Sequence, residues 1–472
     1  MKITLNNDNV YNETIIELSK LIRGTRWENN VYLVGGAVRD LIMGKRIKDI
    51  DLCVTLLDGG IKFAEWVCLE TGNYKEESNP CIFKKYGTAK FNLRNMTSIS
   101  KVDIECVHTR KEQYHDSESR NPETSYGTID EDCNRRDLTI NALYLNISTF
   151  EVIDPCGKGI EDINNHILRT PTDPDIVYKD DPLRMLRAIR FSSKFNWGIE
   201  KDTWLGIVKN AYRINIISQE RITEEINKIL LTDVPSYGIR KLYHCGLLKL
   251  VLPTIYNLIG VEQNKYHFGD VFDHTMSTID KTKSILVNRL AALFHDCGKP
   301  YCRTFINGVA HFYDHEKESA IIANVILRRM KYSKPEINKV DIAIKNHMRF
   351  KQSGNHCPSN KAIRKFISDV GDENIGITLD VIDADNKSHA KEYCLNDQVA
   401  FIINKINELK QKENVSSEAK LPINGKDIIE RFNLKSSPKI GTFLEVIKDR
   451  FLENPNITKE ECLDIVEKLL TV

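Results

Sequence analysis

The stretch VYLVGGAVRDLIMGKRIKDIDLCVT, residues 31–55, decides the fold of the N-terminal part of this chain. Residues 31–34 are apolar and predict a buried strand. Gly35 and Gly36 predict a tight turn, and residues 37–43 predict a helix. A strand, a glycine turn and the first N–H groups of a helix together form a cradle for phosphate. A Gly-Gly pair before a helix is weak evidence when it stands alone.

The next strand carries two acids, Asp49 and Asp51. Side chains alternate along a strand, so both acids face one side while Ile50 and Leu52 face the core. Neighbouring carboxylates repel each other unless a cation lies between them, and Mg²⁺ prefers carboxylate and phosphate oxygens. An isolated pair of this kind would indicate a solvated edge strand. Beside a phosphate cradle, the pair favours a catalytic magnesium site.

The pattern of predicted secondary structure changes along the rest of the chain. β-rich and helical runs alternate up to about residue 150, helical patterns follow, and eight of the twelve histidines gather between residues 265 and 395. We therefore predict an α+β protein in which an all-α part follows a mixed α/β head. The predicted regions are a head (1–150), a helical neck (151–262), a histidine-rich helical region (263–395) and a helical tail (396–472).

Composition restricts the class of protein. No apolar run reaches the roughly 18 residues that a membrane span needs, and the N-terminus lacks the pattern of a secretion signal. The twelve cysteines are scattered singly and form no CxxC pair, which favours reduced thiols and a cytoplasmic protein. The net charge of +1 means that a nucleic-acid partner requires locally concentrated positive charge.

Residues 180–194 supply such a concentration. Arg184, Arg187, Arg190 and Lys194 recur every three or four residues and predict a basic stripe on one helix face. A solvated charged face is the alternative reading. Asp181 precedes Pro182, which also makes this aspartate a good helix N-cap.

Several motifs in order resemble those of class II tRNA nucleotidyltransferases and bacterial poly(A) polymerases. The resemblance covers roughly residues 28–390. The matching residues are Gly35-Gly36, Arg39-Asp40, Gly44, Asp49-x-Asp51, Tyr86-Gly87-Thr88, Val102–Glu105, Glu131–Ala142 with its Arg135-Arg136-Asp137, and Asp180–Phe191. Leu138 replaces a phenylalanine and Asp180 a glutamate of the family pattern. Glu220, Arg221 and Glu225 resemble a motif that braces the helix of the basic stripe.

The resemblance implies a two-metal nucleotidyl transfer. Asp49, Asp51 and Glu105 would be the catalytic acids, the first two holding Mg²⁺, with Asp103 a rival to Glu105 because the two share a strand face. Asp181 and Arg184 would read the base of CTP or ATP. The other residues expected to bind the nucleotide are Gly35, Gly36, Arg39, Arg135, Arg136, Asp137, Asn141, Arg187 and Arg190.

A second set of residues follows the order H…HD…H…H…D and resembles an HD-type phosphohydrolase domain. Its members are His274, His295, Asp296, His315, His347 and Asp385, with Asp383 competing for the last position. Clustered imidazoles and carboxylates suit a divalent metal centre. The resemblance leaves open one metal or two, the identity of the metal, and whether the domain is active or a scaffold.

The expected function is addition of CCA from CTP and ATP to the 3′ end of tRNA, with no membrane partner. A CC-adding or A-adding specialist and a poly(A) polymerase are alternatives. The loop that separates the specialists should lie within residues 59–85. The run from Phe83 to Thr88 lacks the stretch typical of poly(A) polymerases. An HD phosphohydrolase with a degenerate RNA-binding head is the alternative from a different class.

Overall fold

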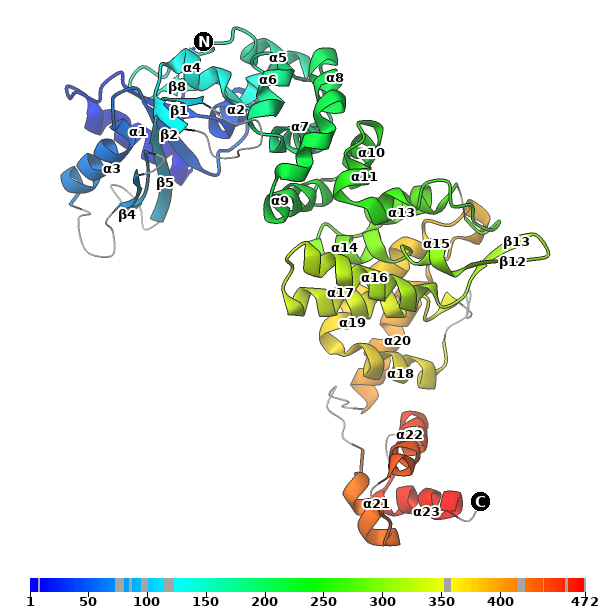
Figure 1. The fold of residues 1–472 in the computed structure, drawn as a ribbon. Helices are drawn as coiled ribbons and strands as arrows, with labels where there is room; N and C mark the ends of the chain where they lie inside the picture. The colour runs from blue at the N-terminus through cyan, green and yellow to red at the C-terminus, as the bar shows by residue number, and fades with distance from the viewer. Residues whose placement is uncertain are drawn as a thin grey trace. The chain divides into compact units, whose positions relative to one another are not determined.

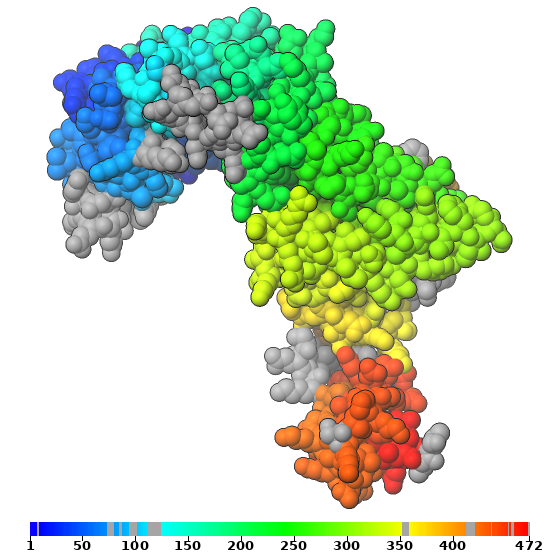
Figure 2. All heavy atoms as spheres, in the orientation of Figure 1, coloured from blue at the N-terminus to red at the C-terminus, as the bar shows by residue number. Residues whose placement is uncertain are grey.

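The computed structural model describes residues 1–6, 9–72, 80–84, 87–94, 101–113, 123–267, 269–351, 358–413, 421–435, 437–454 and 457–470. Lys85, Tyr86 and part of the predicted specificity loop therefore lie outside the described residues. The chain divides into two compact units, Met1–Leu252 and Pro253–Val472. Unit 1 runs from blue to green in Figures 1 and 2, and unit 2 from green to red. The four predicted regions are finer than these units and remain a prediction.

The head of unit 1 is built on a seven-stranded sheet of order β3-β4-β5-β2-β1-β8-β9. β2 pairs with β5 in parallel and with β1 in antiparallel orientation, so the predicted mixed α/β head is confirmed. The strands are β1 Val31–Val34, β2 Ile50–Val54, β3 Cys81–Phe83, β4 Thr88–Arg94, β5 Lys101–His108, β8 Tyr144–Asn146 and β9 Val152–Ile153, while β6 Arg110–Gln113 and β7 Glu123–Tyr126 form a separate hairpin.

The stretch of residues 31–55 folds as predicted. β1 is followed by Gly35 and by α2, Gly36–Ile42. Gly35 has φ 70° and ψ −134°, a conformation that only glycine adopts without strain. Ile50 and Leu52 are buried while Asp51 lies on the opposite, exposed side of β2. This alternation turns the acids toward solvent at the end of the sheet nearest α2.

Helices cover the sheet and continue beyond it. Trp27 and Phe63 pack edge to face in the core beside α3. The helices of unit 1 are α1 Val10–Ile22, α3 Gly59–Glu70, α4 Ile129–Asn134, α5 Gly159–Asn165, α6 Pro174–Asp180, α7 Leu183–Phe195, α8 Lys201–Asn210, α9 Gln219–Leu230, α10 Pro235–His244 and α11 Leu248–Val251, with short strands β10 Ile167–Leu168 and β11 Gly198–Ile199. The predicted helical neck is thus present, and α7 carries the predicted basic stripe.

Unit 2 is helical apart from one hairpin. Its elements are α12 Pro253–Tyr256, α13 Val271–Lys281, α14 Leu286–Phe294, α15 Lys299–Cys302, β12 Arg303–Ile306, β13 Val309–Phe312, α16 His315–Arg329, α17 Lys334–Asn346, α18 Asn360–Val370, α19 Asp372–Asn386, α20 Gln398–Glu413, α21 Gly425–Phe432, α22 Pro438–Glu453 and α23 Lys459–Leu470. The last three helices share a core of their own around Ile428, Ile447 and Val466. In the described part of the chain, no helix combines the length and apolar content of a bilayer crossing.

Gly60 lies where α3 packs closely against the backbone of the sheet. A Cβ at this position would lie 2.7 Å from the carbonyl oxygen of Gly87 and from the Cα of Val107. We expect Gly60→Ala to destabilise unit 1 by about 1–3 kcal/mol, because backbone atoms cannot make room for the methyl group. All four tryptophans, at positions 27, 66, 197 and 204, lie in unit 1, so denaturant unfolding followed by tryptophan fluorescence measures the change. Gly198→Ala is the control, since nothing lies within 4 Å of its added Cβ.

Candidate active site

Three carboxylates meet on the exposed face of the central strands. Asp51 on β2 is the direct register partner of Glu105 on β5, and Asp49 lies two residues before Asp51. Burial and the neighbouring carboxylates of Asp49 and Glu105 raise the pKa of Asp51 to about 6. The raised pKa records a concentration of negative charge that a divalent cation would relieve.

Asp103 and Glu105 are told apart by their surroundings. Both side chains lie on the exposed face of β5, but Asp103 is 61% exposed and forms an ion pair with Lys90 at 3.8 Å. Glu105 adds to the negative potential at Asp51. This arrangement favours Glu105 as the third acid of the cluster.

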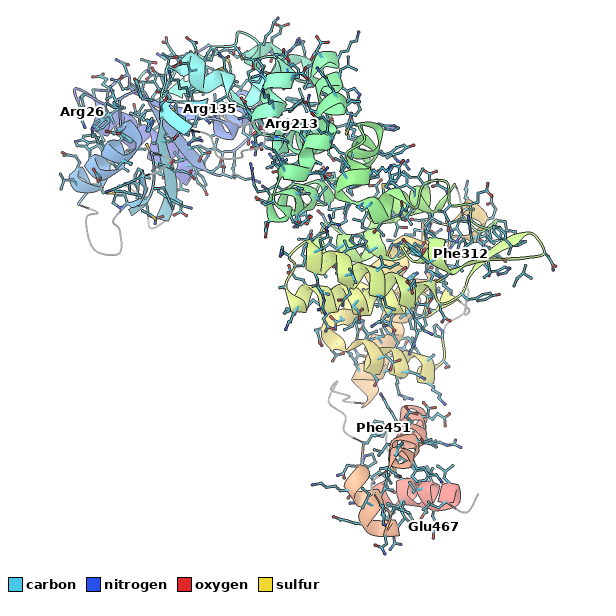
Figure 3. All side chains as sticks on the ribbon, in the orientation of Figure 1. Arg26, Arg135, Arg213, Phe312, Phe451 and Glu467 are labelled. Carbon is cyan, nitrogen blue, oxygen red and sulfur yellow. The ribbon has the colours of Figure 1, made fainter. Side chains whose placement is uncertain are left out.

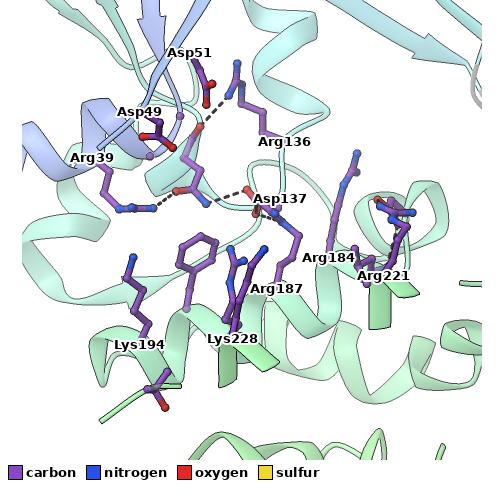
Figure 4. Close-up of a pocket in the computed structure, with 18 of the residues that line it drawn as sticks. Arg39, Asp49, Asp51, Arg136, Asp137, Arg184, Arg187, Lys194, Arg221 and Lys228 are labelled. Atoms are coloured by element: carbon purple, nitrogen blue, oxygen red, sulfur yellow. Dashed lines mark hydrogen bonds and ion pairs between the residues drawn. The ribbon is translucent and has the colours of Figure 1, made fainter. Parts of the chain in front are cut away.

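A cavity of about 960 Å³ opens beside Asp49 and Asp51, which is large enough for a nucleotide. Figure 4 shows its cationic side chains, which come from α2, the segment after α4, α7 and α9. The lining residues include Gly35, Gly36, Arg39, Asp49, Asp51, Arg135, Arg136, Asp137, Asn141, Asp181, Arg184, Arg187, Arg190, Phe191, Lys194, Arg221 and Lys228. Every predicted nucleotide-binding residue is in this set, so the structure brings all of them to one cavity.

A chain of hydrogen bonds runs across the cavity wall from α2 to α7 (Figure 4). Arg39 donates to the Asn141 side-chain oxygen at 2.6 Å, and the Asn141 amide donates to Asp137 at 3.1 Å. Asp137 in turn accepts from Arg187 at 2.7 Å. Burial alone would raise the pKa of Asp137, but Arg187 and Asn141 outweigh it and lower the value to about 2. Asp137 is therefore ionised and holds α7 against the head.

Arg135 and Arg136 share one buried counterion, Asp132. Arg135 Nε donates to Asp132 Oδ1 at 3.0 Å, and Arg136 Nη2 donates to Oδ2 at 3.0 Å. The Tyr144 hydroxyl donates to the same carboxylate. Burial opposes the charge on Asp132, yet the two guanidinium groups hold its pKa well below the usual range. Both arginines are thereby fixed in direction at the cavity wall; Arg135 is labelled in Figure 3.

The start of α7 carries the predicted base-reading pair. Asp181 Oδ1 accepts a hydrogen bond from the Leu183 N–H at 3.1 Å, although Pro182 and not Asp181 occupies the N-cap position of α7. Its Oδ2 accepts from Arg221 on α9 at 2.7 Å. Arg184 is buried and donates to the Val177 carbonyl oxygen at 3.1 Å. Asp181 and Arg184 both line the cavity, and each is oriented by a neighbouring element.

The basic stripe on α7 is present, but it faces the cavity and is partly neutralised. Arg187 pairs with Asp137, and Arg190 pairs with the buried Glu225 of α9 at 3.2 Å. The stripe therefore lies beside the proposed site, as predicted, and Lys194 is its exposed member. Its binding of a phosphate backbone stays a prediction. Contacts from Arg221 and Glu225 make α9 the brace of α7, as the motif at residues 220–225 predicts.

In unit 2, four imidazoles converge on one buried carboxylate. His315 and His347 approach Asp296 Oδ1 at 3.2 and 3.8 Å, while His274 and His295 approach Oδ2 at 3.5 and 3.2 Å. Each of the four rings turns its Nδ1 to a backbone carbonyl oxygen, at 2.7–3.2 Å. This leaves every Nε2 directed at the centre, as in a metal site with backbone-oriented histidines.

Asp385 completes this cluster, which we call the histidine cluster: His274, His295, Asp296, His315, His347 and Asp385. Asp385 lies 3.0 Å from His274 Nε2, whereas Asp383 pairs with Lys387. Burial and the neighbouring imidazoles lower the pKa of His347 to about 3, so its ring is neutral and able to bind a metal. Asp296 is fully buried, yet neither oxygen receives a hydrogen bond of regular geometry. This set of imidazole nitrogens and carboxylate oxygens fits a divalent metal ion.

Two further cations belong to this centre and were missed in the sequence. Lys299 pairs with Asp296 at 2.7 Å, and Lys351 pairs with Asp385 at 2.8 Å. His267 and His389 stack near His274. A cavity of about 410 Å³ is lined by these four residues and by members of the histidine cluster. In unit 1 the missed residue is Asp132, which its spacing of three and four from Arg135 and Arg136 could have revealed.

Comparison with known proteins agrees with this geometry. Residues 31–169 match the poly A polymerase head domain, and residues 196–258 match the probable RNA and SrmB-binding site of polymerase A. A tRNA nucleotidyltransferase of Schizosaccharomyces pombe is 35% identical over 51% of this chain and 50% of its own length. The CC-adding tRNA nucleotidyltransferase of Thermus thermophilus is 28% identical over 71% of both chains. This chain spans about half the length of the first curated relatives it matches.

The similarity in fold to solved structures extends over almost the whole chain. The crystal structure of the Bacillus stearothermophilus CCA-adding enzyme in complex with CTP matches with a TM-score of 0.66 and 20% identity, covering 97% of this chain and 96% of that one. The acid cluster lies within the matched head domain, residues 31–169, and the arginine-lined cavity opens beside it. The chain is thus similar to tRNA nucleotidyltransferases and, over this segment, to the poly A polymerase head domain.

Asp132 should be essential to the stability of the cavity wall. We expect Asp132→Asn to destabilise unit 1 by about 3 kcal/mol at neutral pH, because two guanidinium groups lose a buried partner. The pKa of Asp132 in the folded protein lies below its unfolded value of about 3.9. This stabilisation is therefore complete above the unfolded pKa and is lost as the pH falls through the folded pKa. Tryptophan-monitored unfolding of wild type and variant at several pH values measures the difference. The exposed Asp130 on the same helix provides the control, Asp130→Asn.

Proposed function

We propose that this protein adds CCA to the 3′ end of tRNA, taking CTP and ATP as substrates. The observation that carries the proposal is the acid cluster of Asp49, Asp51 and Glu105 at the edge of a cavity lined by arginines. A polymerising site needs acids for metal beside cations for a triphosphate, and this cavity offers both. The relatives named as tRNA nucleotidyltransferases support tRNA as the acceptor.

In the proposed reaction, the acidic residues would hold the metal and the basic residues would bind the phosphates. Mg²⁺, held by Asp49 and Asp51 with Glu105 on the nucleophile side, would activate the RNA 3′-hydroxyl and neutralise the triphosphate. Arg39, Arg135 and Arg136 would bind the phosphates, since guanidinium groups match phosphate oxygens. The buried Asp132 holds Arg135 and Arg136 in place, and Asn141 holds Arg39, so binding requires little rearrangement.

Base selection would rest on the start of α7. An aspartate accepts hydrogen bonds and an arginine donates them, so Asp181 and Arg184 can together imitate a pairing base. Each carboxylate oxygen of Asp181 accepts one hydrogen bond from the protein and has a second lone pair for a ligand. Arg221 would then orient Asp181 rather than contact the base. Loss of Arg221 should consequently weaken discrimination among nucleotides more than the rate of transfer.

Single-residue variants test the acid cluster. With Mg²⁺, a tRNA that lacks CCA, and CTP and ATP, we expect the wild type to add CCA and stop. Asp51→Ala and Glu105→Gln should lower the rate on the order of a thousandfold, because both change the charge at the metal site. Asp103→Asn is the matched control and should keep most of the activity, since Asp103 faces Lys90.

The products also decide among the related activities. Addition of CC alone or A alone would identify a specialist, and an unlimited A tail would identify a poly(A) polymerase. Folded protein that extends no RNA end would contradict the transferase proposal altogether.

We further propose that the histidine cluster is a two-metal phosphohydrolase centre. The specific support is the position of Asp296, whose two oxygens face different imidazole pairs, so that donors for two metals would be available. His274, His295 and Asp385 would complete one site, and His315 and His347 the other. Bound metals would supply Lewis-acid chemistry for phosphate-ester hydrolysis, and Lys299 and Lys351 would attract the substrate's negative charge.

Metal content tests this centre independently of activity. We expect about two divalent ions per chain after loading with Mn²⁺, measured by elemental analysis of desalted protein. His274→Ala and His347→Ala should each leave about one ion, and Asp296→Ala should leave almost none. His311→Ala, on the hairpin outside the cluster, is the control. Equal metal content in all variants would refute the assignment.

We propose a cytoplasmic location, because the twelve cysteines are scattered singly in the sequence and the eleven described ones are free thiols.

A further inference from the structure

The hairpin of β12 and β13 exposes large apolar and aromatic side chains. Phe305 is 61% exposed, and Ile306, Val309 and Tyr313 are also exposed. Figure 1 shows the hairpin standing out from the helices of unit 2. Among the described strands it pairs only with itself. Clustered exposed apolar groups of this kind mark an interaction surface.

Strand register places three of its side chains on one face. Arg303 is paired with Phe312, and Phe305 with Ala310, and paired residues of antiparallel strands share a face. The Arg303 guanidinium lies 5.4 Å from the centroid of the Phe305 ring. In the described part of the chain, no acidic side chain forms an ion pair with Arg303. We call Arg303, Phe305 and Phe312 the stacking face.

The stacking face leads into the cavity of the histidine cluster. Phe312, labelled in Figure 3, lines that cavity together with Lys299. The Lys299 ammonium lies 5.4 Å from the centroid of the Phe312 ring and 2.7 Å from Asp296. An exposed aromatic and cationic surface is thus continuous with a site whose residues suit phosphate chemistry.

We propose that the stacking face binds unpaired nucleotides of an RNA whose terminal phosphate enters this cavity. Aromatic rings and guanidinium planes are the groups on which unpaired bases stack, and cations attract the backbone. A second copy of the chain or another apolar partner would match Ile306 and Val309 on the opposite face, but it would leave Arg303 without a partner. The cavity end of this proposal rests on the proposed phosphohydrolase centre; the stacking face does not.

Photo-crosslinking tests the stacking face separately from the RNA site of unit 1. A short single-stranded oligoribonucleotide with 4-thiouridine and a 3′-phosphate is irradiated with the full-length protein, and crosslinked peptides are identified by mass spectrometry. We expect crosslinks within residues 303–313. Phe305→Leu should lower their yield at limiting RNA by about tenfold, because it keeps apolar volume but removes the ring on which a base stacks. Phe305→Tyr should retain the yield.

Ile306→Ala is the matched control, because Ile306 lies on the opposite face, and it should also retain the yield. The proposal is overturned by an absence of crosslinks in the hairpin, or by equal yields in Phe305→Leu and wild type. A concentration-dependent dimer that Phe305→Leu disrupts would likewise overturn it and assign the hairpin to a second copy. None of these results depends on bound metal or hydrolysis. Failure of the phosphohydrolase proposal would appear instead in the metal content and in the hydrolysis of a small aryl phosphate.

Discussion

Buried carboxylates that hold cavity arginines are the interaction on which the rest of unit 1 depends. Asp132 fixes Arg135 and Arg136, Asp137 fixes Arg187, and Glu225 fixes Arg190. Without these partners, like charges on α7 and beside α4 would repel one another and turn to solvent. With them, the guanidinium groups stay directed at the cavity that faces Asp49 and Asp51. Stability and recognition therefore share the same ion pairs.

These ion pairs also show how a chain of low net charge can contain a strongly cationic cavity. A net charge of +1 gives the chain as a whole little attraction for a polyanion. Nine of its arginines and lysines line one cavity, and buried acids pair with several of them. In the proposed function, a triphosphate would bind guanidinium groups that these acids already hold in place.

The two units surround their site carboxylates with different groups. In unit 1, three carboxylates on neighbouring strands concentrate negative charge and raise the pKa of Asp51 to about 6. In unit 2, four imidazoles surround Asp296, and their Nδ1 atoms face backbone carbonyl oxygens. The first site suits a hard ion such as Mg²⁺, and the second suits a transition metal.

The sequence by itself determined the features that depend on local spacing. The alternation of Asp49 and Asp51 with Ile50 and Leu52, the glycine turn and the face of α7 all follow from the periods of strands and helices. Register and long-range packing were decided only by the tertiary structure. Parallel pairing of β2 with β5 places Glu105 beside Asp51, and helix packing brings Asp296 between four histidines. Such contacts join residues far apart in the chain, so no local period encodes them.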